Sequence, residues 1–130
     1  MRRGESGGPF DRIRKLCLSL PETEEKLSHG EATFFVKKRV FVMFDNNHHH
    51  YADRLAVWCN AAEGAQEILV GSDPDNFFIP PYVGKGGWIG MRVDRDLPWT
   101  TISSVVKDAY AATCRAVASR RSSARRRSRA

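Results

Sequence analysis

Two runs of β-branched and aromatic residues, 33–36 and 40–44, are separated by only three residues, Lys37-Lys38-Arg39. Runs of this composition favour β-strands. Since parallel strands need a crossover of a dozen or more residues, a connection this short pairs the two strands antiparallel. The pattern therefore predicts a β-hairpin with a basic tip, and with it an antiparallel sheet.

Three more strands are expected at residues 55–59, 77–79 and 88–94. In the last of these Ile89, Met91 and Val93 alternate with Trp88, Gly90 and Arg92. Because alternate side chains of a strand point to opposite faces, the first set should lie in the core. Pro80-Pro81 ends the preceding strand, since proline has no N–H to donate to a sheet.

Three helices are expected around these strands. The first begins near Pro9 and is stopped by Pro21, because its apolar residues recur at a spacing near 3.6. Asn60 with Glu63 resembles a capping box, which predicts a short helix that Gly71 closes. The third begins with Thr100 or Thr101 as its N-cap and runs to about Val117.

The predicted element order is α-β-β-β-α-β-β-α. It indicates an α+β fold in which the N- and C-terminal helices pack on one face of an antiparallel sheet. At 130 residues the chain should form one domain over residues 10–118. Residues 1–9 are expected to be flexible, and the Arg-rich residues 119–130 are expected to be disordered because they bury little apolar surface.

The positive charge of the chain is concentrated at its C-terminal end. The net charge is +6, but residues 115–130 hold seven Arg and no acidic residue. Residues 10–114 hold twelve basic and fourteen acidic side chains. Nucleic-acid binding by the body of the domain therefore requires that its charges be segregated on the surface.

Cysteine use and hydropathy predict a cytoplasmic protein. Cys17, Cys59 and Cys114 are odd in number and lie in apolar patterns, which is typical of reduced core thiols. Residues 1–8 lack the apolar segment of a secretion signal, and no apolar run reaches the length of a membrane span. No cofactor, membrane association or obligate protein partner is expected.

Short motifs in a fixed order resemble those of a known family. They are Leu20-Pro21-Glu22-Thr23, His29-Gly30, Phe41-Val42-Met43-Phe44, Leu55-Ala56-Val57-Trp58-Cys59, Pro80-Pro81-Tyr82-Val83-Gly84, Gly87-Trp88-Ile89-Gly90 and Asp108-Ala109-Tyr110. Over residues 10–117 the chain is similar to the MmcQ/YjbR family of small bacterial proteins. That resemblance implies a frataxin-like double-wing fold and a role in DNA binding.

Basic and aromatic residues at two turns give this role a physical basis. Lys37-Lys38-Arg39 and the loop Gly84-Lys85-Gly86-Gly87 could act as two wings that contact phosphates, with Trp88 and Arg92 between them. No set of residues for reading bases is evident, so binding should be weakly specific. The predicted nucleic-acid-binding residues are Lys37, Lys38, Arg39, Lys85, Trp88 and Arg92.

The histidines and the remaining aromatic residues suggest an alternative. A small-molecule or anion-binding pocket, or an enzyme, could be centred on His29, His48, His49, Tyr82, Lys85 and Trp88, with Trp58 nearby. Trp58 and Trp88 either lie on an open sheet face or pack beneath a loop. Adjacent histidines of an extended chain point to opposite sides, so no metal site is expected. No catalytic residue is assigned, because no nucleophile accompanies the histidines.

Overall fold

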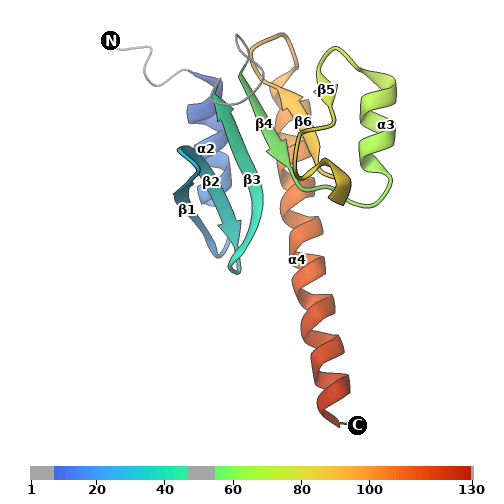
Figure 1. Ribbon diagram of the computed structural model, residues 1–130. Coiled ribbons are helices and arrows are strands. Elements are labelled where there is room, and N and C mark those ends of the chain that lie inside the picture. The colour runs from blue at the N-terminus through green and yellow to red at the C-terminus, as the bar shows by residue number, and fades with distance from the viewer. Residues whose placement is uncertain (1–7, 47–54, 130) are drawn as a thin grey trace.

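A computed structural model of the chain describes residues 8–46 and 55–129. The fold is α+β, with a six-stranded sheet and helices packed on it (Figure 1). The elements are α2 (Pro9–Ser19), β1 (Thr23–Ser28), β2 (Glu31–Val36), β3 (Arg39–Asn46), β4 (Leu55–Cys59), α3 (Ala65–Ser72), β5 (Phe77–Phe78), the 3₁₀ turn η1 (Gly84–Gly86), β6 (Ile89–Arg92) and α4 (Trp99–Arg129).

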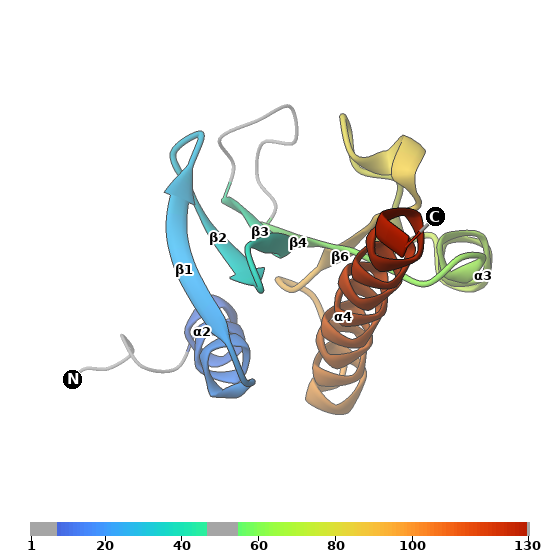
Figure 2. The same ribbon diagram turned by 90° about the horizontal axis from the view of Figure 1, so that it is seen from below.

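The sheet has the strand order β1-β2-β3-β4-β6-β5, and every neighbouring pair is antiparallel. Helices α2 and α4 lie on the same side of it, whereas α3 lies beside the β6 end (Figure 2). This confirms the predicted antiparallel sheet with both terminal helices on one face. The opposite face carries the cavity described below.

The core lies between the sheet and the helices. Phe44 pairs with Val57, Val57 with Met91, and Met91 with Phe77, so this row crosses four strands on one face. All four side chains are buried, as are the predicted Ile89 and Val93. Alternation along the strands therefore correctly identified the face that meets the helices.

The observed order, α-β-β-β-β-α-β-β-α, has one strand more than predicted. The additional strand, β1, has the polar sequence Thr-Glu-Glu-Lys-Leu-Ser and pairs along its whole length with β2. It lies at the edge of the sheet, and Leu27 is 79% exposed. An edge strand of this kind lacks the apolar alternation that marks a half-buried strand, so the sequence did not reveal it.

Both predicted helix caps are wrong. Helix α3 begins only after Gly64, and Asn60 instead donates from Nδ2 to Thr113 Oγ1 at 2.7 Å. Helix α4 begins at Trp99, and its first turn donates from Thr101 N and Ile102 N to the carbonyl of Pro98. Asn60 therefore joins β4 to α4 rather than opening a helix.

Helix α4 continues to Arg129, where disorder was predicted from residue 119 onward. Six of residues 119–130 are Arg, which is a good helix former, and this favours continuation of a helix already fixed by packing. Residues 1–7 lie outside the described part of the chain, so only the start of α2 at Pro9 bears on the predicted flexible N-terminus. No helix among the described residues is both long and apolar enough to cross a membrane.

The turn between β2 and β3 has an unusual composition. Lys37 and Lys38 have φ of 51° and 71°, as a two-residue type I′ turn requires, and Val36 pairs with Arg39 across it. Such turns favour Asn-Gly, because left-handed backbone costs an ordinary residue roughly 1–2 kcal/mol. Two consecutive lysines are therefore held there at a cost in stability.

Lys37→Asn combined with Lys38→Gly is expected to raise the free energy of unfolding by about 1 kcal/mol, because Asn and Gly accept left-handed φ more readily than Lys. Urea denaturation monitored by tryptophan fluorescence measures the change. Lys107→Gly in helix α4 is the control, and there glycine should lower stability by about 1 kcal/mol. A loss of stability in the double variant would contradict the assigned turn.

Candidate functional site

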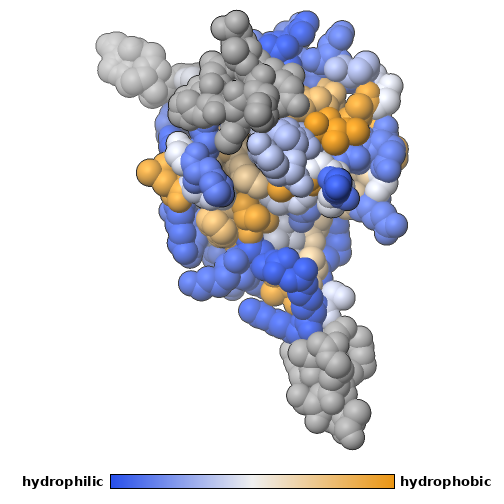
Figure 3. Space-filling view, in the orientation of Figure 1, coloured by the Kyte–Doolittle hydropathy of each residue, from blue (hydrophilic) through white to orange (hydrophobic). Residues whose placement is uncertain are grey.

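A groove of about 600 Å³ lies where the β2–β3 turn, the η1 loop and α4 meet. Hydrophilic side chains gather at this end of the molecule, around the point where α4 leaves the body (Figure 3). The groove is lined by Phe35, Lys38, Arg39, Val40, Asn60, Val83, Gly86, Trp88, Thr113, Ala116 and Arg120. Because these described residues include three cations and no carboxylate, we call it the basic groove.

The lysine turn and helix α4 set the positions of the cations. Lys38 is in the turn and Arg39 is the first residue of β3, so both lie at the same end of the sheet. Ala116 follows Thr113 by three residues and Arg120 follows Ala116 by four, which puts the three on one face of α4. Three cations from segments about 80 residues apart in sequence thus border one groove.

Hydrogen bonds fix the remaining walls of the groove. Gln66 Nε2 in α3 donates to the carbonyls of Gly84 at 2.9 Å and Trp88 at 2.7 Å, and so holds the η1 loop. Thr113 Oγ1 donates to Ala109 O at 2.9 Å and accepts the bond from Asn60. Trp88 is half-buried at the end of this loop. The groove is therefore formed by ordered segments.

The groove cations are accessible to a ligand. Lys38 Nζ is 3.9 Å from Glu24 Oε1, but the lysine side chain is 84% exposed. An exposed ion pair at this distance contributes little and is easily exchanged for another anion. Arg39 and Arg120 are also exposed.

The structure separates Arg92 from the other predicted nucleic-acid-binding residues. Its guanidinium makes two bonds to Asp94, Nε to Oδ1 at 3.1 Å and Nη2 to Oδ2 at 3.0 Å. Burial alone would raise the pKa of Asp94, but the bonds from Arg92 and from Leu55 N–H outweigh it, so the pKa is lowered. The charge of Arg92 is thus balanced by the ionised carboxylate of Asp94, and Arg92 does not line the groove.

The other two predicted cations lie beside the groove. Lys37 precedes Lys38 in the left-handed turn, and Lys85 is exposed on η1 next to Gly86. Neither contributes to the lining. Of the six predicted residues, the structure therefore brings Lys38, Arg39 and Trp88 together.

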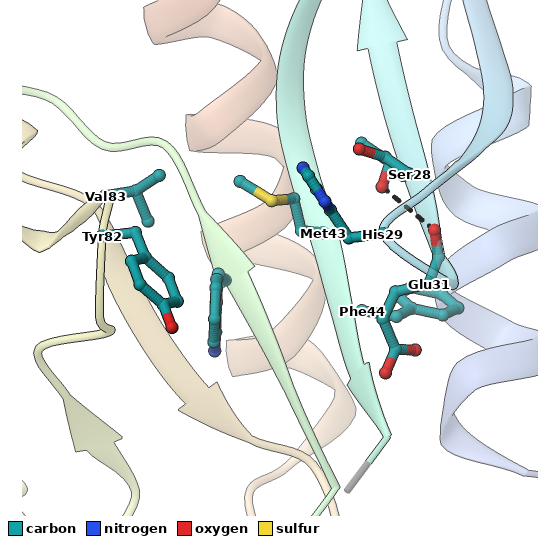
Figure 4. A pocket seen from close by; sticks show the side chains of 9 residues that line it. Ser28, His29, Glu31, Met43, Phe44, Tyr82 and Val83 are labelled. Atoms are coloured by element: carbon teal, nitrogen blue, oxygen red, sulfur yellow. Dashed lines mark hydrogen bonds between the residues drawn. The ribbon is translucent and has the colours of Figure 1, made fainter. Parts of the chain in front are cut away.

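A second cavity, of about 390 Å³, lies on the sheet face opposite α2 and α4 (Figure 4). Its lining residues are Ser28, His29, Glu31, Thr33, Met43, Phe44, Trp58, Tyr82 and Val83. This sheet cavity unites His29, Trp58 and Tyr82 of the predicted alternative pocket. It leaves Lys85 and Trp88 outside, and His48 and His49 lie outside the described residues.

Two residues with left-handed backbone border the sheet cavity. His29, in the β1–β2 turn, has φ of 55°, and Tyr82, after Pro80-Pro81, has φ of 67°. Their side chains come from opposite sides of the cavity, with Met43 between them (Figure 4). Left-handed backbone costs an ordinary residue roughly 1–2 kcal/mol, so the surrounding structure must hold both residues in this conformation.

The floor of the sheet cavity is apolar and its rim carries polar groups. Met43 pairs with both Thr33 and Trp58, so the three form one row across β2, β3 and β4. Trp58 is 4% exposed, which shows that it packs into the sheet rather than lying open. The rim contributes the Ser28 hydroxyl, the His29 imidazole and the buried carboxylate of Glu31. These groups can bind a planar ring and hydrogen-bond its edge.

Cys17 and Cys59 offer no nucleophile to either cavity. Burial raises the pKa of Cys17 to about 12 and also raises that of Cys59, so both are protonated at neutral pH. Neither lines the groove or the sheet cavity. Within the residues described, no three His, Cys, Asp or Glu side chains cluster as metal ligands would.

Sequence reasoning missed several members of both cavities. Arg120 was assigned to a disordered tail, although its spacing from Thr113 and Ala116 continues the stripe of the last helix. Ser28, Glu31 and Met43 were not singled out, because their approach depends on strand pairing. Val83 lines both cavities, so the basic groove and the sheet cavity adjoin at this residue.

A family model and a solved structure are similar to this chain. A model of the YjbR family matches residues 18–112. The crystal structure of Deinococcus radiodurans protein DR2400, with the family domain DUF419, is similar at a TM-score of 0.67 and 20% identity, over 78% of this chain and 75% of that one. At 20% identity this similarity shows that the two proteins share a fold and nothing more. Curated proteins give no match.

Proposed function

This chain belongs to the YjbR family, and from that premise we propose that it is a nucleic-acid-binding protein, without catalytic activity, that holds phosphates in the basic groove. The observation that carries the proposal is the convergence of Lys38, Arg39 and Arg120 on one groove whose described lining has no carboxylate. The acidic excess of residues 10–114 had argued against such binding. The meeting of three cations at one groove supports binding despite that excess.

Phosphate contacts in the groove account for affinity without sequence specificity. Lysine and arginine side chains bind phosphate oxygens and release condensed counterions, which gives salt-sensitive binding to any sequence. Trp88 provides a half-buried aromatic surface beside these cations. Helix α4 continues from the groove to Arg129, so the Arg-rich segment extends the same binding region.

Binding of fluorescein-labelled DNA to the full chain and to a chain ending at Ser122 tests the proposal. The shorter chain keeps Arg120 and the whole groove lining but lacks the last four arginines. Fluorescence anisotropy over a salt series should show that both bind, with a slope of log affinity against log salt that is smaller in the shorter chain. Complete loss of binding in the shorter chain would assign the affinity to the Arg-rich segment alone.

A further inference from the structure

We infer that the sheet cavity receives one unstacked base of a single strand whose phosphates lie in the basic groove. This inference rests on the proposed function and adds a preference for single-stranded over duplex nucleic acid. Its starting point is that Val83 forms a wall of both cavities. A strand that leaves the groove across Val83 therefore reaches the sheet cavity directly.

The size and lining of the sheet cavity suit a heteroaromatic ring. Its volume of about 390 Å³ is within the usual range for small-ligand sites. Tyr82, 75% exposed, offers a ring on one side, and Met43 and Trp58 form an apolar floor. Aromatic side chains bind unpaired bases of any sequence by stacking, because every base has a π-face.

Polar groups at the rim match the edge of a base. Glu31, a residue only 6% exposed, lines the cavity, and its carboxylate can accept from an amino or imino N–H. Ser28 and His29 each provide a group that can donate or accept a hydrogen bond. A base paired within a duplex presents neither its faces nor this edge, so only an unpaired base can enter.

The restrained backbone at the rim supports a binding role. His29 and Tyr82 account for two of the five non-glycine residues described with positive φ, and they face each other across this cavity. A rim held in place before binding requires less ordering when the ring enters. The positive φ of His29 also completes the two-residue β1–β2 turn, in which Gly30 follows with φ of 83°.

Single strands that are matched in length, with and without bases, test the inference in the full chain. The probes are a short oligothymidylate, an abasic strand with the same number of phosphates, and a duplex of equal length. Wild-type protein should bind the oligothymidylate roughly tenfold more tightly than the abasic strand, which corresponds to one stacked base. Equal affinity for these two strands would overturn the inference and leave the proposed function standing.

Variants at the rim of the sheet cavity test whether this cavity causes the preference for the oligothymidylate over the abasic strand. Tyr82→Asn removes the ring at an exposed position and keeps a residue that accepts left-handed backbone, and His29→Asn does the same across the cavity. Tyr82→Asn should abolish the preference and leave affinity for the abasic strand unchanged. Ile79→Asn, also exposed but outside the lining, is the matched control and should change neither value. A preference that survives both Tyr82→Asn and His29→Asn would overturn the inference.

A titration with free thymidine separates failure of the cavity from failure of the groove. If neither strand binds in a salt-dependent manner, the proposed function fails. Saturable quenching of tryptophan fluorescence by thymidine, lost in Tyr82→Asn, would then assign the cavity to a free nucleoside and overturn its role in strand binding. Thymidine binding far weaker than oligothymidylate binding is the expected result, because the nucleoside lacks the groove contacts.

Discussion

Arg39→Glu combined with Arg120→Glu is expected to weaken DNA binding about 60-fold at 0.1 M salt. Affinity varies with salt to the power of about −0.9 for each neutralised phosphate, so each contact contributes about eightfold between 1 M and 0.1 M. Both arginines line the basic groove, and both are exposed, so neither change should disturb the core. Fluorescence anisotropy at several salt concentrations measures the loss, and the salt slope should fall by about two.

The matched control changes the net charge equally at a distance from the groove. Arg95→Glu combined with Lys107→Glu reverses two exposed cations that do not line it. This variant should bind only severalfold more weakly than wild type, through the change in overall field. Equal losses in the two double variants would mean that total charge, rather than the groove, determines binding.

Phe44→Ala is expected to lower the free energy of unfolding by about 3–5 kcal/mol. Phe44 is 5% exposed, and its ring centroid lies 4.3 Å from that of Phe10 in a stacked arrangement and 5.1 Å from that of Phe34. Removing the ring leaves a hole between α2 and the sheet and breaks both aromatic contacts. Such a loss is a large share of the stability of a small domain.

Urea denaturation of wild type and Phe44→Ala gives this difference directly. Leu27→Ala is the control, because its side chain is 79% exposed on the edge strand β1 and should change stability by less than about 0.5 kcal/mol. A cost below about 1 kcal/mol for Phe44→Ala would contradict its assigned position between α2 and the sheet.

The parts of the fold that the sequence predicted are those with local patterns. The β2–β3 hairpin followed from two apolar runs around a three-residue connection, and the core face of β6 followed from the alternation of Ile89, Met91 and Val93. Strand β1 was missed because its stability comes from pairing along β2 rather than from apolar residues of its own. Asn60 was misassigned because its distant partner, Thr113, is invisible to local pattern analysis.

In the candidate site, too, residues with a local sequence pattern were predicted, and those that depend on distant contacts were not. Lys38, Arg39 and Trp88 were identified from their chemistry and from their expected position at turns, and they do line one groove. Arg92 was included because it shares a strand face with Trp88, yet Asp94 engages its guanidinium. Arg120 could not be placed, because the length of α4 beyond its apolar stripe depends on how far the packed part of the helix propagates.

The most direct test of the central claim is a map of amide chemical-shift changes when a short DNA strand is added to the isotopically labelled full chain. The basic groove predicts the largest changes at Lys38, Arg39, Gly86, Trp88 and Arg120, and small changes at the distant β6–α4 connection around Arg95. Changes confined to residues beyond Ser122, with the groove amides unmoved, would contradict it.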